Sequence, residues 1–503
     1  MTAAEQKEKT RISKHLDENI KQIDAVMGIK ENFDVLTREL SFGGKRAVLL
    51  FIDGLTNDTI LTLILQTLVG LDREDMAPDS LQKLMKKHLG YTEVEQAEYL
   101  DDVINKVLAG PQALLIDGQE KAIILDARTY PVRGPEEPDL ERVVRGSRDG
   151  FVETLVFNTA LIRRRLRDPK LRMEYVQVGS RSKTDVIVCY IEDIANPDLV
   201  KNIKDKIEYI QIDGIPMAEK AVEELITPGS YWNPFPKVRY TERPDVAAMH
   251  LLEGYVLVLA DTSPSVIIAP ATYFNHLQHA EEFRQNPTVG AYLRWVRYIG
   301  VAISLFILPL WFLFASNPAL LPPALAFIGP EKAGKIPLLL QFIMAEVFID
   351  MIRLATIHTP AALATSTGII AAVLIGELAT RVGLFAQEVV LYVSVVAVGT
   401  FLTPSVELAN ANRLVRLVIL VLTALFGLPG FLIGSVGIIV FLALTRSFGV
   451  PYLWPLFPLN LKALLGVAVR RPVATQNMRP SILRPIDRDR QVVAVPARKP
   501  GKK

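Results

Sequence analysis

Residues 298–315 read YIGVAISLFILPLWFLFA, a stretch that contains no charged side chain. Eighteen apolar residues in a helix, at about 1.5 Å of rise each, cross most of a hydrocarbon core that is about 30 Å thick. Arg294 and Arg297 precede the stretch, and basic flanks of this kind stay on the cytoplasmic side. The stretch therefore predicts a membrane crossing that runs outward, with the residues before 291 in the cytoplasm.

Further apolar runs predict a multi-pass helical domain. They cover residues 361–378, 384–402 and 417–445. The run 336–355 differs, because Glu346 and Asp350 lie four residues apart on one helical face. Charged groups are costly in lipid, so we expect this helix to lie at the interface or to face a protein or water-filled interior.

The number of crossings depends on two of these runs. If both termini are cytoplasmic, the number is even. An interfacial 336–355 helix and one kinked span over 417–445 give four crossings, whereas a spanning 336–355 helix and a last run divided at Leu428-Pro429-Gly430 give six. We expect four, because each half of the divided run would hold only about fourteen residues, too few for a normal crossing.

Two helical runs carry small residues on one face. The last run has glycines at steps of three and four, which let another helix approach closely: Gly427, Gly430, Gly434 and Gly437. The run 361–378 has a similar face, formed by Thr365, Gly368, Ala372 and Gly376. Copies of such a helix can converge around a pore, and ordinary helix packing is the alternative explanation.

Two acidic residues are candidates for attracting cations to such a pore. Glu377 lies at the end of the small-residue run and Glu388 lies after it, and the two could form a ring at the pore mouth. Glu377 also lies four residues before Arg381, so a local ion pair is the alternative.

The part before the first crossing has strands alternating with helices, which is typical of α/β domains. Asp117-Gly118 between two apolar segments predicts a hairpin over 112–126. We expect further strands at 45–55, 173–178, 185–191, 255–260 and 266–268, and helices at 59–71, 151–167 and 197–210. The polar segment 1–30 predicts a solvated amphipathic helix, with docking on a partner as the alternative.

The predicted fold class is an α/β two-subdomain cytoplasmic domain followed by an α-helical multi-pass membrane domain. A loop rich in proline and glycine at 130–138 divides the subdomains. The expected parts are a polar helix (1–30), two α/β subdomains (31–138 and 139–290), a transmembrane domain (291–458) and a basic cytoplasmic tail (459–503).

Composition excludes several classes of function. The lone Cys189 excludes an intramolecular disulfide and any multi-cysteine metal site, and its apolar neighbours predict a core thiol. No nucleotide, hydrolase or metalloprotease motif occurs in a suitable context, so we expect no enzyme, cofactor or bound metal. The run Arg163-Arg164-Arg165 lacks a nucleic-acid motif beside it, and we expect a solvated face or a contact with lipid or a neighbouring subunit.

The two ends of the sequence suggest a cytoplasmic location. The first thirty residues are dense in Lys, Glu, Asp and Gln, so we expect no signal peptide. Residues 459–503 carry eleven Lys or Arg residues against Asp487 and Asp489, which predicts contact with anionic lipid.

Several motifs resemble the A subunits of the GerA-type spore germination receptors. They are RDGFVE (148–153), ALIRRR (160–165), YTERPD (240–245), IAPATYF (268–274) and RSFGVPYL (446–453). Residues 231–236, YWNPFP, point to one branch of that family. The resemblance implies a two-subdomain cytoplasmic domain, residence in the spore inner membrane and assembly into an oligomeric ion channel. It does not imply that this chain binds a nutrient.

The leading hypothesis is a homo-oligomeric cation channel that opens early in germination or amplifies that signal. A solute transporter that uses Glu346 and Asp350 is one alternative, and a non-conducting scaffold is another. Other germination-receptor or SpoVA-type membrane proteins and a small membrane protein are the expected partners; nucleic acid is not.

Overall fold

The computed structural model describes residues 9–76, 80–85, 89, 93–130, 141, 143–227, 229, 232–321, 334–358, 377 and 379–490. The chain forms two compact units. The α/β unit comprises Met1–Pro228, Tyr240–Pro270 and Pro472–Lys503, and the helical unit comprises Gly229–Arg239 and Ala271–Arg471.

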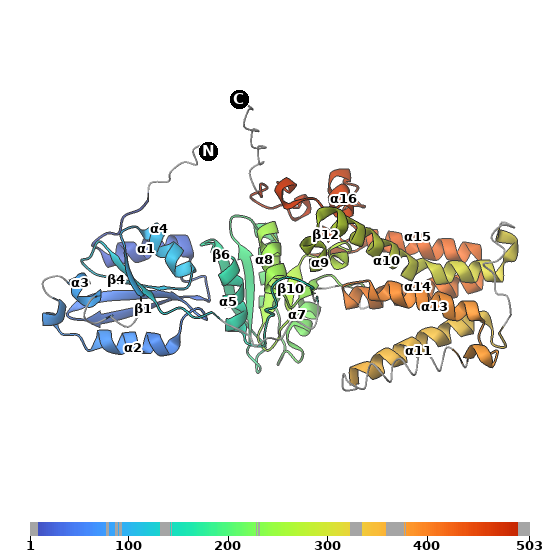
Figure 1. The fold of residues 1–503 in the computed structure, drawn as a ribbon, viewed down its shortest axis with the longest axis horizontal. Helices are drawn as coiled ribbons and strands as arrows, with labels where there is room; N and C mark the ends of the chain where they lie inside the picture. The colour runs from blue at the N-terminus through green and yellow to red at the C-terminus, as the bar shows by residue number, and fades with distance from the viewer. Residues whose placement is uncertain are drawn as a thin grey trace, which may run out of the picture. The chain divides into compact units, whose positions relative to one another are not determined.

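The first subdomain of the α/β unit is a five-stranded sheet covered on both faces. Its antiparallel order is β1 (Val35–Phe42), β2 (Lys45–Ile52), β4 (Gln112–Ile116), β5 (Ala122–Asp126) and β3 (Glu93–Ala97). Helix α2 (Asp58–Val69) covers one face, with η1 (Arg73–Met76) and α3 (Ser80–Lys83) after it. Helices α1 (Leu16–Met27) and α4 (Leu100–Leu108) cover the other (Figure 1).

The second subdomain repeats this strand order. Its sheet runs β6 (Leu171–Val178), β7 (Thr184–Ile191), β9 (Val256–Ala260), β10 (Val266–Ala269) and β8 (Arg239–Thr241). Helices α5 (Leu155–Arg165) and α8 (Pro244–Glu253) share one apolar core with this sheet, while α6 (Pro197–Glu208) and α7 (Ala218–Ile226) pack beside each other. The confirmed predictions are the 112–126 hairpin, the 59–71 and 197–210 helices and the predicted strands of this sheet.

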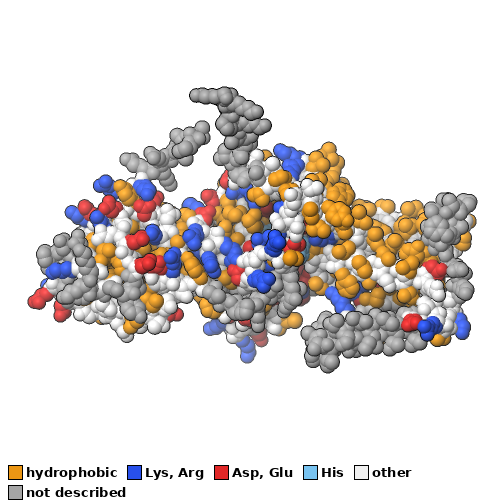
Figure 2. All heavy atoms as spheres, viewed as in Figure 1, with side chains coloured by type: hydrophobic (Ala, Val, Ile, Leu, Met, Phe, Trp, Pro, Cys, Tyr) orange, Lys and Arg blue, Asp and Glu red, His pale blue; other side chains and the backbone are white. Residues whose placement is uncertain are grey.

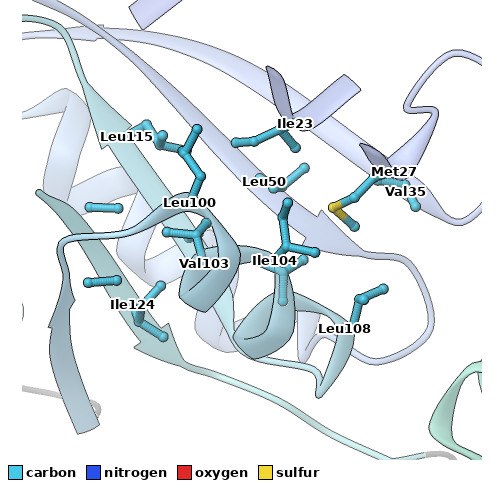
Figure 3. Close-up of a cluster of buried hydrophobic side chains, with 14 of the residues drawn as sticks. Ile23, Met27, Val35, Leu50, Leu100, Val103, Ile104, Leu108, Leu115 and Ile124 are labelled. Atoms are coloured by element: carbon cyan, nitrogen blue, oxygen red, sulfur yellow. The ribbon is translucent and has the colours of Figure 1, made fainter. Parts of the chain in front are cut away.

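The prediction of a solvated N-terminal helix is wrong. The apolar residues of α1 pack between the sheet and α4, where Ile23 is fully buried and Met27 is 1% exposed. Figure 3 shows both side chains pointing toward Leu50 and Ile104. The three- and four-residue spacing that indicates an amphipathic helix therefore marks a core-facing stripe. The expected boundary loop falls mostly on residues outside those described.

The helical unit is built from long apolar helices. They are α10 (Pro287–Ser316), α11 (Leu338–His358), α13 (Gln387–Phe401), α14 (Val406–Phe426) and α15 (Leu428–Leu444). Helix α10 packs against α13 and α14, and α14 packs against α15 (Figure 1). Within the described residues, α10 and α14 are long and apolar enough to cross a membrane, whereas α13 and α15 are shorter apolar helices.

Shorter elements flank these helices. They are η3 (Asn275–Leu277), α9 (Ala280–Arg284), η4 (Pro318–Leu320), the ribbon of β11 (Arg446–Ser447) and β12 (Val450–Pro451), and α16 (Leu461–Ala468).

The interpretation of residues 417–445 as one kinked span is wrong. Helix α14 begins at Val406, well before the apolar run, and ends at Phe426; Gly427 follows it with a φ of +62°, which suits glycine. Helix α15 then packs back along α14. The two helices have 21 and 17 residues, so each is longer than the roughly fourteen residues expected for half of the run. The run 361–378 lies outside the described residues, apart from Glu377.

The predicted basic tail divides between the two units. Helix α16 belongs to the helical unit, whereas the segment from Pro472 belongs to the α/β unit. There η6 (Val473–Thr475) and η7 (Ser481–Leu483) lead Leu483 into the core of the second subdomain, where it is 2% exposed. Ile486 N–H donates to the Ile194 carbonyl oxygen at 2.9 Å.

Candidate functional site

Charged side chains of α11 and α14 face each other inside the helical unit. Glu346 Oε2 lies 2.7 Å from Arg416 Nη2, and one turn further along α11 Asp350 accepts a hydrogen bond from Arg413. Arg353 Nη1 donates to Asn410 Oδ1 at 2.8 Å. Residue numbers rise along α11 while those of its partners fall along α14, as expected for antiparallel helices. We call this series the α11–α14 charge ladder.

The Glu346–Arg416 pair is the most buried part of the ladder. The two side chains are 4% and 2% exposed, against 35% and 17% for Asp350 and Arg413. Arg416 Nη1 also donates to the Ser304 carbonyl oxygen of α10 at 2.6 Å. One guanidinium group therefore joins three helices.

A small hollow of about 20 Å³ lies beside this pair, which is room for one water molecule. Its lining includes Glu346, Arg353, Thr400, Arg413 and Arg416. Glu346 Oε1 and Arg416 Nε are buried without a hydrogen-bond partner among the described residues. A water molecule that donates to Glu346 Oε1 and accepts from Arg416 Nε would satisfy both atoms.

The other predicted acidic residues lie elsewhere in the helical unit. Glu377 Oε1 is 2.5 Å from Arg381 Nη2, and both side chains are at least half exposed. Glu388 lies in the first turn of α13, where the helix dipole favours a carboxylate. The predicted pore-lining residues Thr365, Gly368, Ala372 and Gly376 lie outside the described residues.

The four predicted packing glycines differ in their surroundings. A Cβ atom on Gly430 would lie 2.0 Å from the Leu422 carbonyl oxygen, and one on Gly434 would lie 3.2 Å from Ile419 Cγ1. Both neighbours belong to α14 of the same chain. Gly427 forms the turn between the helices, and a Cβ on Gly437 would meet nothing within 4 Å.

Sequence reasoning missed the basic half of the ladder. It began the apolar run at Leu417 and so left Arg413 and Arg416 outside the helix. The signal was present, since two arginines three residues apart match two acidic residues four residues apart. A second close crossing was also missed, because a Cβ on Gly399 would lie 2.5 Å from the Gly300 carbonyl oxygen.

In the α/β unit the side chains of the run Arg163-Arg164-Arg165 contact other residues of the protein. Arg163 is buried, so the expectation of a solvated face is wrong for this residue. Its Nε and Nη2 bind both carboxylate oxygens of Asp34 at 2.7 and 2.8 Å. Burial alone would lower the pKa of Arg163, but the charge of Asp34 outweighs it and raises the pKa. Arg165 binds Asp149, and Arg164 lies over the Tyr130 ring.

Cys189 is fully buried near this pair. Burial raises the pKa of its thiol far above the ordinary value, as for a core thiol. Among the described residues, no group of three His, Cys, Asp or Glu side chains could hold a metal ion.

The chain is similar to known proteins of bacterial spores. Residues 21–482 match the family described as Bacillus/Clostridium GerA spore germination protein. Stage V sporulation protein AF of Bacillus subtilis (strain 168) is 49% identical over 484 residues, covering 96% of this chain and 98% of that protein. Spore germination protein GerLA of Bacillus cereus is 31% identical, covering 90% and 93%, and spore germination protein KA of B. subtilis is 29% identical, covering 97% and 90%.

One solved structure is similar to the N-terminal part. It is the N-terminal domain of the A subunit of the Bacillus megaterium spore germinant receptor GerK3, 26% identical, with a TM-score of 0.42. The similarity covers 53% of this chain and 99% of that domain.

Proposed function

The chain belongs to the Bacillus/Clostridium GerA spore germination protein family, and on that premise we propose that it is an oligomeric cation channel of the spore inner membrane. Membership confirms the predicted family resemblance and supports a role in sporulation and germination. Within the family, residues 231–236 point to stage V sporulation protein AF, and the 49% identity confirms that resemblance.

One observation carries the membrane part of the proposal: the helical unit is apolar outside and charged inside. Large apolar side chains at least half exposed line the outer faces of α13, α14 and α15, among them Leu391, Val398, Val418, Leu425, Ile433 and Val436. Figure 2 shows hydrophobic side chains gathered over these helices. Glu346 and Arg416 are buried instead. Lipid makes this arrangement favourable, because it solvates the apolar faces and penalises exposed charge.

This distribution favours six crossings over four. Helix α11 can span the membrane because α14 supplies arginines for its two carboxylates. The spans are α10, α11, the run 361–378, α13, α14 and α15, which leaves both termini in the cytoplasm. The α/β unit then belongs to the cytoplasmic side.

For conduction we propose that the run 361–378 converges with its copies around the axis. Thr365, Gly368, Ala372 and Gly376 would line the pore, because small and hydroxylated side chains leave room for ions. Glu377 and Glu388 would raise the cation concentration at its mouth. The α11–α14 charge ladder would stabilise the helices that surround this pore.

Planar-bilayer recording with the purified full-length chain tests this proposal. We expect cation-selective single-channel steps that disappear when Thr365, Gly368 and Ala372 are replaced by leucine. Gly437→Leu is the matched control, because a Cβ atom at that position would meet nothing within 4 Å. Conductance that survives the triple replacement would count against the pore assignment.

The transporter alternative is less favoured, since both carboxylates of α11 are already compensated by arginines. A substrate cation would have to displace Arg416. The scaffold alternative, in which the chain positions other germination-receptor or SpoVA-type proteins, predicts complexes without an axial hole. Imaging the symmetry of the detergent-solubilised particle separates these possibilities.

A further inference from the structure

Helix α16 and the loop before it form an apolar segment that buries none of its side chains. The helix reads LKALLGVA, and no residue in it is buried. Six of the segment's large apolar side chains are 43% to 67% exposed, whereas Leu464 and Val467 are partly buried; the six are Leu456, Phe457, Leu459, Leu461, Leu465 and Val469. Figure 2 shows hydrophobic side chains where Figure 1 places α16. Such a patch on a soluble surface is costly and marks an interaction site.

Polar contacts to its backbone hold this segment in place. Arg294 Nη1 of α10 donates to the carbonyl oxygens of Gly466 at 3.3 Å and Val467 at 2.9 Å. Tyr298 Oη donates to the same Val467 oxygen at 3.0 Å. The N-terminal half of α10 therefore holds α16 through the carbonyl groups near the C-terminus of α16, and Leu461 and Leu465 remain exposed.

The surroundings match a lipid headgroup region. On α10, Tyr292 and Trp295 are 67% and 50% exposed, and the Trp295 ring contacts that of Tyr298. Aromatic side chains of this kind gather at membrane interfaces. Lys462 is exposed, and no Asp or Glu occurs between residues 456 and 486. The charge therefore suits anionic lipid.

We propose that residues 456–469 are an in-plane membrane anchor, with their leucines in the headgroup–acyl boundary of the cytoplasmic leaflet and Lys462 at anionic headgroups. The anchor rests on the proposed membrane location of the helical unit. The segment packs against α10 beside Arg294 and Tyr298, where the uncharged stretch that we propose crosses the bilayer begins. The patch is small, amphipathic and flanked by basic and aromatic residues, as interfacial helices are.

Site-directed fluorescence in vesicles tests the anchor. The full-length Leu465→Cys variant is labelled with bimane and reconstituted in vesicles of phosphatidylglycerol and phosphatidylethanolamine. The native Cys189 is fully buried and does not compete. We expect lipids brominated at shallow acyl carbons to lower the emission about twofold, because interfacial helices sit about 5–10 Å into the boundary. Leu461→Cys, one turn away, repeats the measurement in case the first variant misfolds.

Two further labels separate this inference from the membrane proposal. Ile433→Cys on α15, 65% exposed, is expected to be quenched by deep bromine, and Tyr209→Cys in the α/β unit, 81% exposed, only by aqueous iodide. Quenching at 433 with iodide quenching at 461 and 465 overturns the anchor alone. Protection of 461 and 465 from both quenchers also overturns it, because a protein then covers the segment. Absence of lipid quenching at 433 overturns the membrane location itself.

Discussion

Both units contain buried arginine–carboxylate pairs, and the pair Arg163–Asp34 of the α/β unit and the pair Arg416–Glu346 of the helical unit are satisfied to different degrees. In the α/β unit, Arg163 binds both oxygens of Asp34 and also donates to the carbonyl oxygens of Asp168 and Leu171. In the helical unit, Arg416 shares one hydrogen bond with Glu346, and Glu346 Oε1 and Arg416 Nε have no partner among the described residues.

The two pairs therefore contribute to the structure in different ways. A saturated pair fixes its neighbours, because any movement breaks several charge-assisted hydrogen bonds at once. A half-satisfied pair beside a hollow leaves room for a water molecule or a second arrangement. We infer that the contact of Asp34 with Arg163 is the rigid one and that the contact of α11 with α14 is the adjustable one.

Breaking the saturated pair has the largest expected effect. Asp34→Ala leaves the buried Arg163 without its counter-charge, which costs roughly 3–5 kcal/mol. The rate at which Cys189 reacts with a thiol reagent measures opening of this core, and we expect it to rise roughly a hundredfold to several thousandfold. Asp193→Ala, at an exposed position of the same subdomain, is the control. Equal labelling rates in the two variants would contradict a stabilising role of the Asp34–Arg163 ion pair.

Breaking the Glu346–Arg416 pair is expected to destabilise the protein less. A second replacement, of Glu346, is expected to reverse most of that loss. Arg416→Leu leaves Glu346 buried and unpaired, which lowers the free energy of unfolding by about 2–3 kcal/mol. Adding Glu346→Leu is expected to restore most of that stability, because an apolar pair replaces a poorly satisfied ionic one. Tryptophan fluorescence during heating in detergent reports on this, since Trp311 contacts Phe342 of α11 and all four tryptophans lie in the helical unit.

If the double variant Glu346→Leu with Arg416→Leu is no more stable than Arg416→Leu alone, the Glu346–Arg416 pair is not the less satisfied of the two pairs. The matching double replacement of Asp34 and Arg163 is expected to stay unstable. It also removes the donors to the Asp168 and Leu171 carbonyl oxygens.

The position of α14 depends on its close approach to α15. Gly430→Ala places a methyl group against the Leu422 backbone, and overpacking of this kind costs about 1–3 kcal/mol. Gly437→Ala meets nothing within 4 Å and is expected to stabilise the helix by up to about 1 kcal/mol. The same fluorescence melt compares the two. Similar melting temperatures would show that α15 does not hold α14.

A partly exposed pair in the α/β unit gives the smallest effect. Burial raises the pKa of Asp149, but hydrogen bonds from Arg165 and Ser147 outweigh it, so the pKa is lowered. The stabilisation, about 1 kcal/mol or less, is therefore present above the ordinary carboxyl pKa and is lost as pH falls through the lowered value. Urea midpoints followed by circular dichroism at pH 5 and pH 3 should converge for wild type and Asp149→Asn at the lower pH. A constant difference would contradict the assignment.

Sequence patterns predicted local elements well, but they predicted exposed strands and the ends of helices poorly. Asp-Gly in the 112–126 hairpin and Asn-Pro at the start of α6 act over a few residues, so they were readable. Strand β1 was missed because most of its side chains are exposed and show no clean alternation. The 417–445 run was misread because charge, rather than structure, was taken as its boundary.

The residue pattern alone was enough to identify the family, the apolar runs and the acidic residues that need compensation, because these depend on residues close together in the chain. Tertiary structure alone decided the partners. Asp34 meets Arg163 across 129 residues, and Glu346 meets Arg416 across 70. Whether two such side chains touch depends on the rotation and register of the elements that carry them. Packing across the whole unit sets both.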